Sequence, residues 1–180
     1  EEQLISRPYF VRDGYFDDVD IVFHPHIGSD FQTQYGLRQY ALISAKFHFQ
    51  GESAHGAVSP WRGRDALDAA ELMDIGFDKF REHLEPTQRS HRVITSGGVQ
   101  PNVIPDTATI WWFFRESTAE GVGEIFERAQ EIAQGAALMT ETTFSVEIMS
   151  AVWPSRANQT AAEAIQKNIE LIGMPEWSQE

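Results

Sequence analysis

The 180-residue sequence contains no cysteine. This absence excludes a disulfide scaffold and a thiol nucleophile, and it leaves histidine and carboxylates as the ligands for any metal. No apolar run approaches the roughly 20 residues of a membrane-spanning helix, and the opening residues Glu-Glu-Gln do not form a signal peptide. Basic residues are few: 14 Lys and Arg stand against 27 Asp and Glu, which gives a formal net charge of −13. That charge argues against nucleic acid or an anionic membrane as a partner, and we expect a soluble, cytoplasmic protein.

Hydrophobic residues make up 42% of the sequence and aromatic residues 12%, which is enough for a packed core. The length allows one large domain or parts of two. The sequence begins on two acids without an initiator methionine, and it ends on Met174–Glu180, a helix exit followed by the start of another segment. We therefore expect a piece of a longer chain.

Hydrophobic patterns in the middle of the sequence predict six elements in the order strand, helix, strand, strand, helix, strand. The pattern is period-two in strands and three- or four-residue steps in helices. The predicted elements are a strand at 41–50, a helix at 61–84, strands at 91–96 and 107–114, a helix after the capping box Ser117–Glu120, and a strand at 143–149 in which Phe144, Val146 and Ile148 point inward. This order is that of the split β-α-β, ferredoxin-like sandwich. It predicts an α+β fold with an antiparallel sheet and two helices on one face.

The flanking segments do not fit that sandwich. Residues 19–23 read as a strand that ends near His24 and His26, and residues 158–172 read as a helix capped by Asn158. We expect the sandwich, residues 38–154, to be inserted in a second domain. Residues 1–37 enter that domain and residues 155–180 return to it.

Three residues of the middle segment are candidate site residues. His55 lies among small residues on a tight connection after a strand, where its ring can reach outward. Asn102 precedes Val-Ile-Pro-Asp and is either a substrate contact or a turn former. Arg115 ends an apolar strand, where its charge needs an anionic partner: Glu116, Asp106 or a substrate carboxylate.

Two further clusters lie near the start of the sequence. Glu1 and Glu2 are either a solvated terminus or a functional pair, in which one carboxylate binds a divalent cation and its neighbour takes a proton from metal-bound water. The His24-Pro25-His26 segment is either a metal ligand at a strand end or a surface loop. The residues alone leave both alternatives open.

In combination, several stretches resemble one zinc-dependent family, which includes aminoacylases, glutamate-releasing carboxypeptidases and auxin-conjugate amidohydrolases. The stretches that carry the resemblance are Val11–Gly14, Phe16–Asp20, Ser53–His55, Gly63–Ala69, Arg81–His83 and, after Gly97-Gly98, Pro101–Asp106. Within the family, the resemblance is greatest to members that hydrolyse aminobenzoyl-glutamate. It implies a metal-dependent amidohydrolase that cleaves the amide bond of N-acyl amino acids.

The resemblance also implies a role for each candidate residue. Glu1 corresponds to the general base, Glu2 to a metal ligand, and His26 to the next ligand, with His24 as the second choice. His55 corresponds to the histidine that stabilises the tetrahedral oxyanion, commonly in the partner subunit's site. Asn102 and Arg115 correspond to residues that hold the substrate's backbone and its free carboxylate.

The inserted sandwich corresponds to the family's lid or dimerisation domain, and residues 1–37 and 155–180 to its catalytic domain. The implied metal is zinc, with manganese or cobalt possible, and the implied partners are a second copy of the chain and a second hydrolase subunit. The family's early His-x-Asp motif, bridging acid and late ligand histidine are absent from this sequence, so we expect this piece alone to be inactive. The alternative is a non-catalytic dimerisation module, or a module that binds amino acids or peptides.

Overall fold

The computed structural model describes residues 6–25 and 31–173, and these divide into two compact units. The first unit is Tyr40–Pro154. The second comprises the described residues 6–25, 31–39 and 155–173.

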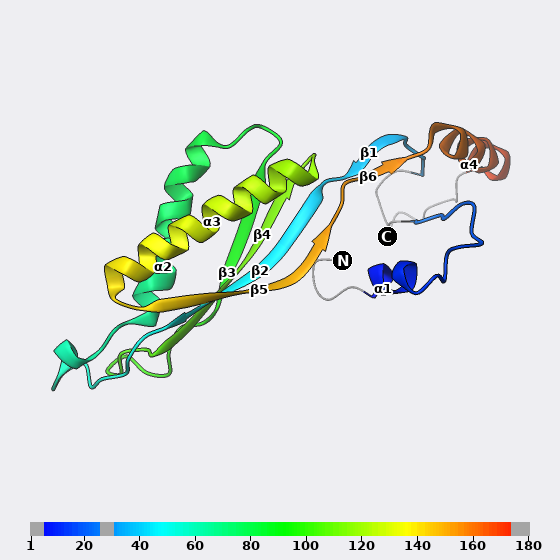
Figure 1. Cartoon of the computed structure of the whole chain (residues 1–180). Coiled ribbons are helices and arrows are strands. Elements are labelled where there is room, and N and C mark those ends of the chain that lie inside the picture. Colours follow the sequence, from blue (N-terminus) through cyan, green and yellow to red (C-terminus); the bar gives the residue numbers. More distant parts are fainter. Residues whose placement is uncertain (1–5, 26–30, 174–180) are drawn as a thin grey trace, which may run out of the picture. The chain divides into compact units, whose positions relative to one another are not determined.

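The first unit is a two-layer sandwich. Its elements are β2 (Ala41–Gln50), α2 (Ala66–Phe80), β3 (Arg89–Ser96), β4 (Thr107–Glu116), α3 (Ala119–Thr140) and β5 (Thr143–Val152). The strands form an antiparallel sheet in the order β3-β4-β2-β5, and both helices lie on one face of it (Figure 1). This arrangement confirms the predicted α+β, ferredoxin-like fold.

The core of the sandwich lies between the helices and the sheet. Phe77 of α2 packs its ring 4.7 Å from that of Trp112 and 5.5 Å from that of Phe114, and all three side chains are buried. The two helices approach closely, since a Cβ on Gly76 would lie 2.8 Å from the Ile132 side chain. Burial of this aromatic cluster provides the main stabilisation of the unit.

The predicted helix at 61–84 is shorter in the structure. Residues Pro60–Arg62 form a 3-10 turn, and α2 begins only after Asp65, whose carboxylate accepts from the backbone N–H of Leu67 at 2.8 Å. A capping carboxylate at the N-terminus fixes the helix start there. The helix ends at Phe80 and continues as a second 3-10 turn, Arg81–His83.

The inward orientation predicted for Ile148 is wrong, since this side chain is 56% exposed. It lies on β5, an edge strand of the sheet, opposite a break in the regular register of β2 and β5 at Ser44 and Ala45. A register break of this kind bends the strand and changes where its side chains point.

The second unit contains a two-stranded ribbon and two helices. Strand β1 (Gly36–Gln39) pairs antiparallel with β6 (Ser155–Ala157), and the helices are α1 (Arg7–Arg12) and α4 (Gln159–Ile172). The Thr33 hydroxyl donates to the Ala162 carbonyl at 2.8 Å, which ties the chain before β1 to α4.

The strand predicted at 19–23 is not formed, because these residues lie in a turn and an extended segment without a pairing strand. Within the described segments, no helix is long and apolar enough to cross a membrane.

Candidate functional site

His55 lies on an exposed connection between β2 and α2. Its Nδ1 accepts a hydrogen bond from the backbone N–H of Ala57 at 3.2 Å. Because Nδ1 is the acceptor, the neutral ring carries its proton on Nε2. An exposed Nε2–H is a donor that can reach a developing negative charge on a ligand.

The loop that carries Asn102, between β3 and β4, runs beside the His55 segment. The backbone N–H of Gly56 donates to the Asn102 carbonyl at 2.9 Å, and that of Ile104 donates to the Ala54 carbonyl at 2.9 Å. These bonds hold His55 and Asn102 on adjacent backbones at the same end of the sandwich.

The Asn102 side chain is exposed, and its Oδ1 accepts from Gln100 Nε2 at 2.7 Å. With the oxygen engaged, the amide nitrogen is the group that can donate to a ligand. The paired loops therefore carry two side-chain N–H donors, one from His55 and one from Asn102, as a site that binds an oxyanion or a carbonyl oxygen requires.

The base of the His55 segment is closed by a narrow neck. Glu52 and Arg64 exchange two backbone hydrogen bonds, both 2.9 Å, and the Gly51 N–H donates to the Asp106 carbonyl at 2.7 Å. A Cβ on Gly51 would lie 1.9 Å from the Arg64 carbonyl oxygen, so only glycine fits here. The neck fixes where the chain leaves β2 and where it enters α2.

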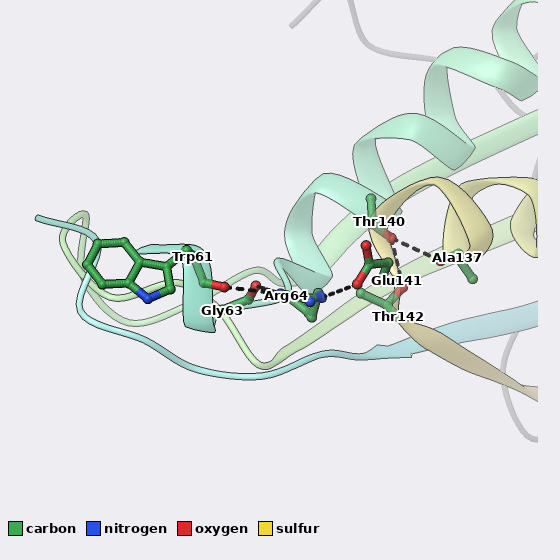
Figure 2. Close-up of polar contacts among 7 residues, drawn as sticks. All are labelled: Trp61, Gly63, Arg64, Ala137, Thr140, Glu141 and Thr142. Atoms are coloured by element: carbon green, nitrogen blue, oxygen red, sulfur yellow. Dashed lines mark hydrogen bonds and ion pairs between the residues drawn. The ribbon is translucent and has the colours of Figure 1, made fainter. Parts of the chain in front are cut away.

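The Arg64 side chain holds the same segment from outside (Figure 2). Its Nε donates to Glu141 Oε2 at 2.6 Å, and its Nη1 donates to the Gly63 carbonyl at 2.7 Å and to the Trp61 carbonyl at 3.5 Å. The guanidinium thus joins the 3-10 turn before α2 to the turn between α3 and β5.

Glu141 occupies the left-handed region at the end of α3, with φ 54°. The turn is fixed by a hydrogen bond from the Thr142 N–H to the Ala137 carbonyl at 3.0 Å and by one from the Thr140 hydroxyl to the Ala136 carbonyl at 2.9 Å. The Glu141 carboxylate is largely exposed, and exposed ion pairs contribute only about 0.2–1 kcal/mol. The pair therefore acts mainly on the geometry of the loop.

Arg115 lies at the other end of the sheet, opposite Leu42 of β2. From Thr107 to Arg115 a strand at this rise covers about 27 Å. The Arg115 guanidinium is 6.0 Å from the Phe113 ring centroid. Within this unit the structure brings His55 and Asn102 together but places Arg115 at the opposite end, where the chain enters β2 and leaves β5.

Glu116, one of the partners suggested for Arg115, is buried and engaged elsewhere. Its carboxylate accepts from the Ser117 N–H and hydroxyl and from the Thr87 hydroxyl at 3.0 Å. Burial opposes ionisation of this carboxyl, but these hydrogen bonds and the nearby Arg89 charge outweigh it and lower its pKa. Glu116 therefore stays ionised and links the end of β4 to the start of α3.

The predicted metal-site residues are not part of this geometry. Glu1, Glu2 and His26 lie outside the described residues, while His24 is described and exposed. Among residues 6–25 and 31–173, no three His, Asp or Glu side chains lie close enough to hold a metal ion.

Sequence reasoning missed the Arg64–Glu141 pair. The two residues are 77 positions apart, and neither has a periodic or turn signal that connects them. Glu141 between a helix and a strand carried the only local signal, because a tight helix-to-strand turn needs one residue with positive φ.

Comparison with known proteins agrees with this geometry. The chain is 38% identical over 183 residues to one of the two p-aminobenzoyl-glutamate hydrolase subunits of Escherichia coli (strain K12), covering 100% of this chain and 37% of that protein. It is 29% identical over 175 residues to the Xaa-Arg dipeptidase of Mus musculus, covering 97% and 40%. These relatives are hydrolases, and the chain spans about two-fifths of their length.

The fold matches a crystal structure of the aminobenzoyl-glutamate utilization protein from Klebsiella pneumoniae. The TM-score is 0.70 at 25% identity, over 91% of this chain and 42% of that chain. The peptidase dimerisation domain of the M20 peptidases matches residues 37–141. Because this match covers more than half of the 180 residues, the chain belongs to the M20 peptidase dimerisation-domain family.

Proposed function

We propose that this chain is the lid and dimerisation segment of a metal-dependent amidohydrolase that cleaves N-acyl amino acids of the aminobenzoyl-glutamate kind. The observation that carries the proposal is the pairing of the His55 and Asn102 loops, which brings two N–H donors to one end of the sandwich. The 38% identity to a component of an aminobenzoyl-glutamate hydrolase supports the choice of substrate.

In this proposal His55 stabilises the transition state. Amide hydrolysis passes through a tetrahedral intermediate whose oxygen becomes negatively charged, and a fixed N–H donor lowers its energy. The Ala57 contact keeps the His55 proton on Nε2, where it can donate. Asn102 donates to the substrate backbone beside it.

Arg115 binds the free carboxylate of the substrate in this proposal. Its planar guanidinium can donate two parallel hydrogen bonds to a carboxylate. Because it lies about a strand length from His55, one sandwich cannot place both groups on one small substrate. A site that uses both therefore takes His55 and Asn102 from one protomer and Arg115 from the other.

The metal requirement belongs to the whole protein. The described residues do not hold a metal by themselves, so no step here depends on one. We assign Glu2 and His26 as zinc ligands and Glu1 as the general base, together with groups outside this 180-residue sequence. Zinc, manganese and cobalt all accept such nitrogen and oxygen ligands.

The partner in this proposal is a second copy of the chain, joined through the first unit. The match to a peptidase dimerisation domain favours this arrangement over a monomer. The E. coli hydrolase is named by two different subunits, and the chain is similar to both, at 38% and 27% identity. A second, different hydrolase subunit is therefore the other arrangement to test.

The test is hydrolysis by the full-length protein with p-aminobenzoyl-glutamate and a panel of N-acyl amino acids. We expect turnover that is lost on chelation and restored by zinc. We also expect His55→Ala to lower kcat about 10²–10³-fold without lowering the melting temperature or metal content, because the ring is exposed. Normal turnover in His55→Ala, or no hydrolysis of any acylated amino acid, contradicts the proposal.

A further inference from the structure

The His55 end of the sandwich exposes large apolar side chains. Val58 and Trp61, on the His55 segment, are 66% and 73% exposed, and Val99, on the neighbouring Asn102 loop, is 89% exposed. We call these three residues the apolar tip. They flank the two donors, and such side chains on a fixed backbone commonly mark a contact surface.

The backbone under the apolar tip is held in place. The N–H of Val58 donates to the His55 carbonyl at 3.1 Å, and the Trp61 carbonyl accepts from Arg64. In Figure 2 the Trp61 indole points away from this polar cluster while its carbonyl faces Arg64. A rigid backbone with an outward tryptophan favours binding, because little conformational entropy is lost when a partner covers the ring.

We propose that the apolar tip contacts a second copy of the chain and thereby positions His55 in that copy's active site. This inference rests on the proposed function. Its occupant follows from two observations: the unit belongs to a dimerisation domain family, and the tip lies at the end of the sheet farthest from the point where the unit joins the rest of its own chain. The copy that can accept the His55 loop is therefore the partner.

Trp61 is the main contact in this proposal. Trp is enriched at the centres of protein interfaces because it buries a large area with few rotatable bonds. Its place within six residues of His55 means that loss of its contact shifts the imidazole, and a shift of about 1 Å at a catalytic group can reduce the rate about 10²-fold. Trp61 is therefore a positioning residue that acts through His55.

The first experiment is photo-crosslinking of the full-length protein with p-benzoylphenylalanine at position 61. We expect a crosslinked dimer, in which the crosslink maps to residues of the second copy outside 40–154. Position 153 is the matched control, because Trp153 is 79% exposed at the other end of the sheet. We expect no such crosslinked dimer from position 153.

The second experiment compares Trp61→Ser, Trp61→Phe and Trp153→Ser. We expect Trp61→Ser to lower kcat at least tenfold with an unchanged melting temperature, Trp61→Phe to keep most of the activity, and Trp153→Ser to match the wild type. Crosslinks only within one chain, or equal activity in Trp61→Ser and wild type, overturn the proposal.

Two other outcomes are distinguishable from these. A change in KM for aromatic but not aliphatic acyl groups, without an intersubunit crosslink, identifies Trp61 as a substrate contact and also overturns the proposal. Absence of hydrolysis by the wild-type protein refutes the proposed function, whereas an intersubunit crosslink from position 61 in that same protein retains the contact surface.

Discussion

Replacement of Gly51 by alanine tests the neck of the His55 segment. The new Cβ would lie 1.9 Å from the Arg64 carbonyl oxygen, whereas real Cβ contacts are essentially never below 3.0 Å, so one of the two strands of the neck must move by about 1 Å. The atom in the way belongs to the backbone and cannot rotate aside. Three neck hydrogen bonds depend on this spacing.

The expected magnitude follows from those bonds. At about 0.5–1.5 kcal/mol each, weakening of all three lowers the free energy of unfolding by about 2–4 kcal/mol. The assay is urea unfolding of the 180-residue chain, followed by kcat of the full-length variant. We also expect kcat to fall, because the displaced neck carries His55 with it.

The matched control is Gly123→Ala on α3. A Cβ there meets nothing within 4 Å, so the alanine should stabilise the helix by about 0.5–1 kcal/mol. If Gly51→Ala unfolds at the same urea concentration as Gly123→Ala, the neck does not have the rigidity that we describe.

Two further predictions concern Arg115 and Glu116. Arg115→Lys should lower kcat/KM strongly for substrates with a free carboxylate and much less for amidated substrates, because lysine keeps the charge but lacks the planar fork; equal losses on both, measured by steady-state kinetics, would show a structural role. The pKa of Glu116 is lowered from 4.5 in the folded state, so its stabilisation is present above pH 4.5 and is lost as the pH falls through the lowered value. Glu116→Gln should therefore be less stable than wild type at pH 7, and the difference should shrink towards pH 3 in urea unfolding; a constant difference would contradict this assignment.

The sandwich could be predicted from the sequence because its signals are local. Alternating residues in 41–50 and the apolar stripe of α2 each record which side faces the core, and the order of elements then selects one topology. The limits of α2 were less predictable, because its apolar stripe continues through a 3-10 turn that the Asp65 cap excludes from the helix. The strand expected at 19–23 failed since apolar residues alone do not supply a pairing strand.

The candidate site was predictable only in part. The small residues around His55 and the turn residues around Asn102 marked two loops, but their pairing depends on the antiparallel sheet. The link from Arg64 to Glu141 and the separation of Arg115 from His55 come from tertiary structure, which single-sequence patterns do not record. The roles of Glu1, Glu2 and His26 stay predictions.

Complementation in mixed dimers tests the central claim most directly, namely that His55 serves the partner's active site. A His55→Ala protomer keeps Glu1, and a Glu1→Ala protomer keeps His55, so their heterodimer contains one complete site if His55 acts across the interface. A random one-to-one mixture of the two inactive variants should then recover about a quarter of wild-type activity, since half of the dimers are mixed and each has one working site. Recovery of no activity, with mixed dimers shown to form, would contradict the account and place His55 in the site of its own protomer.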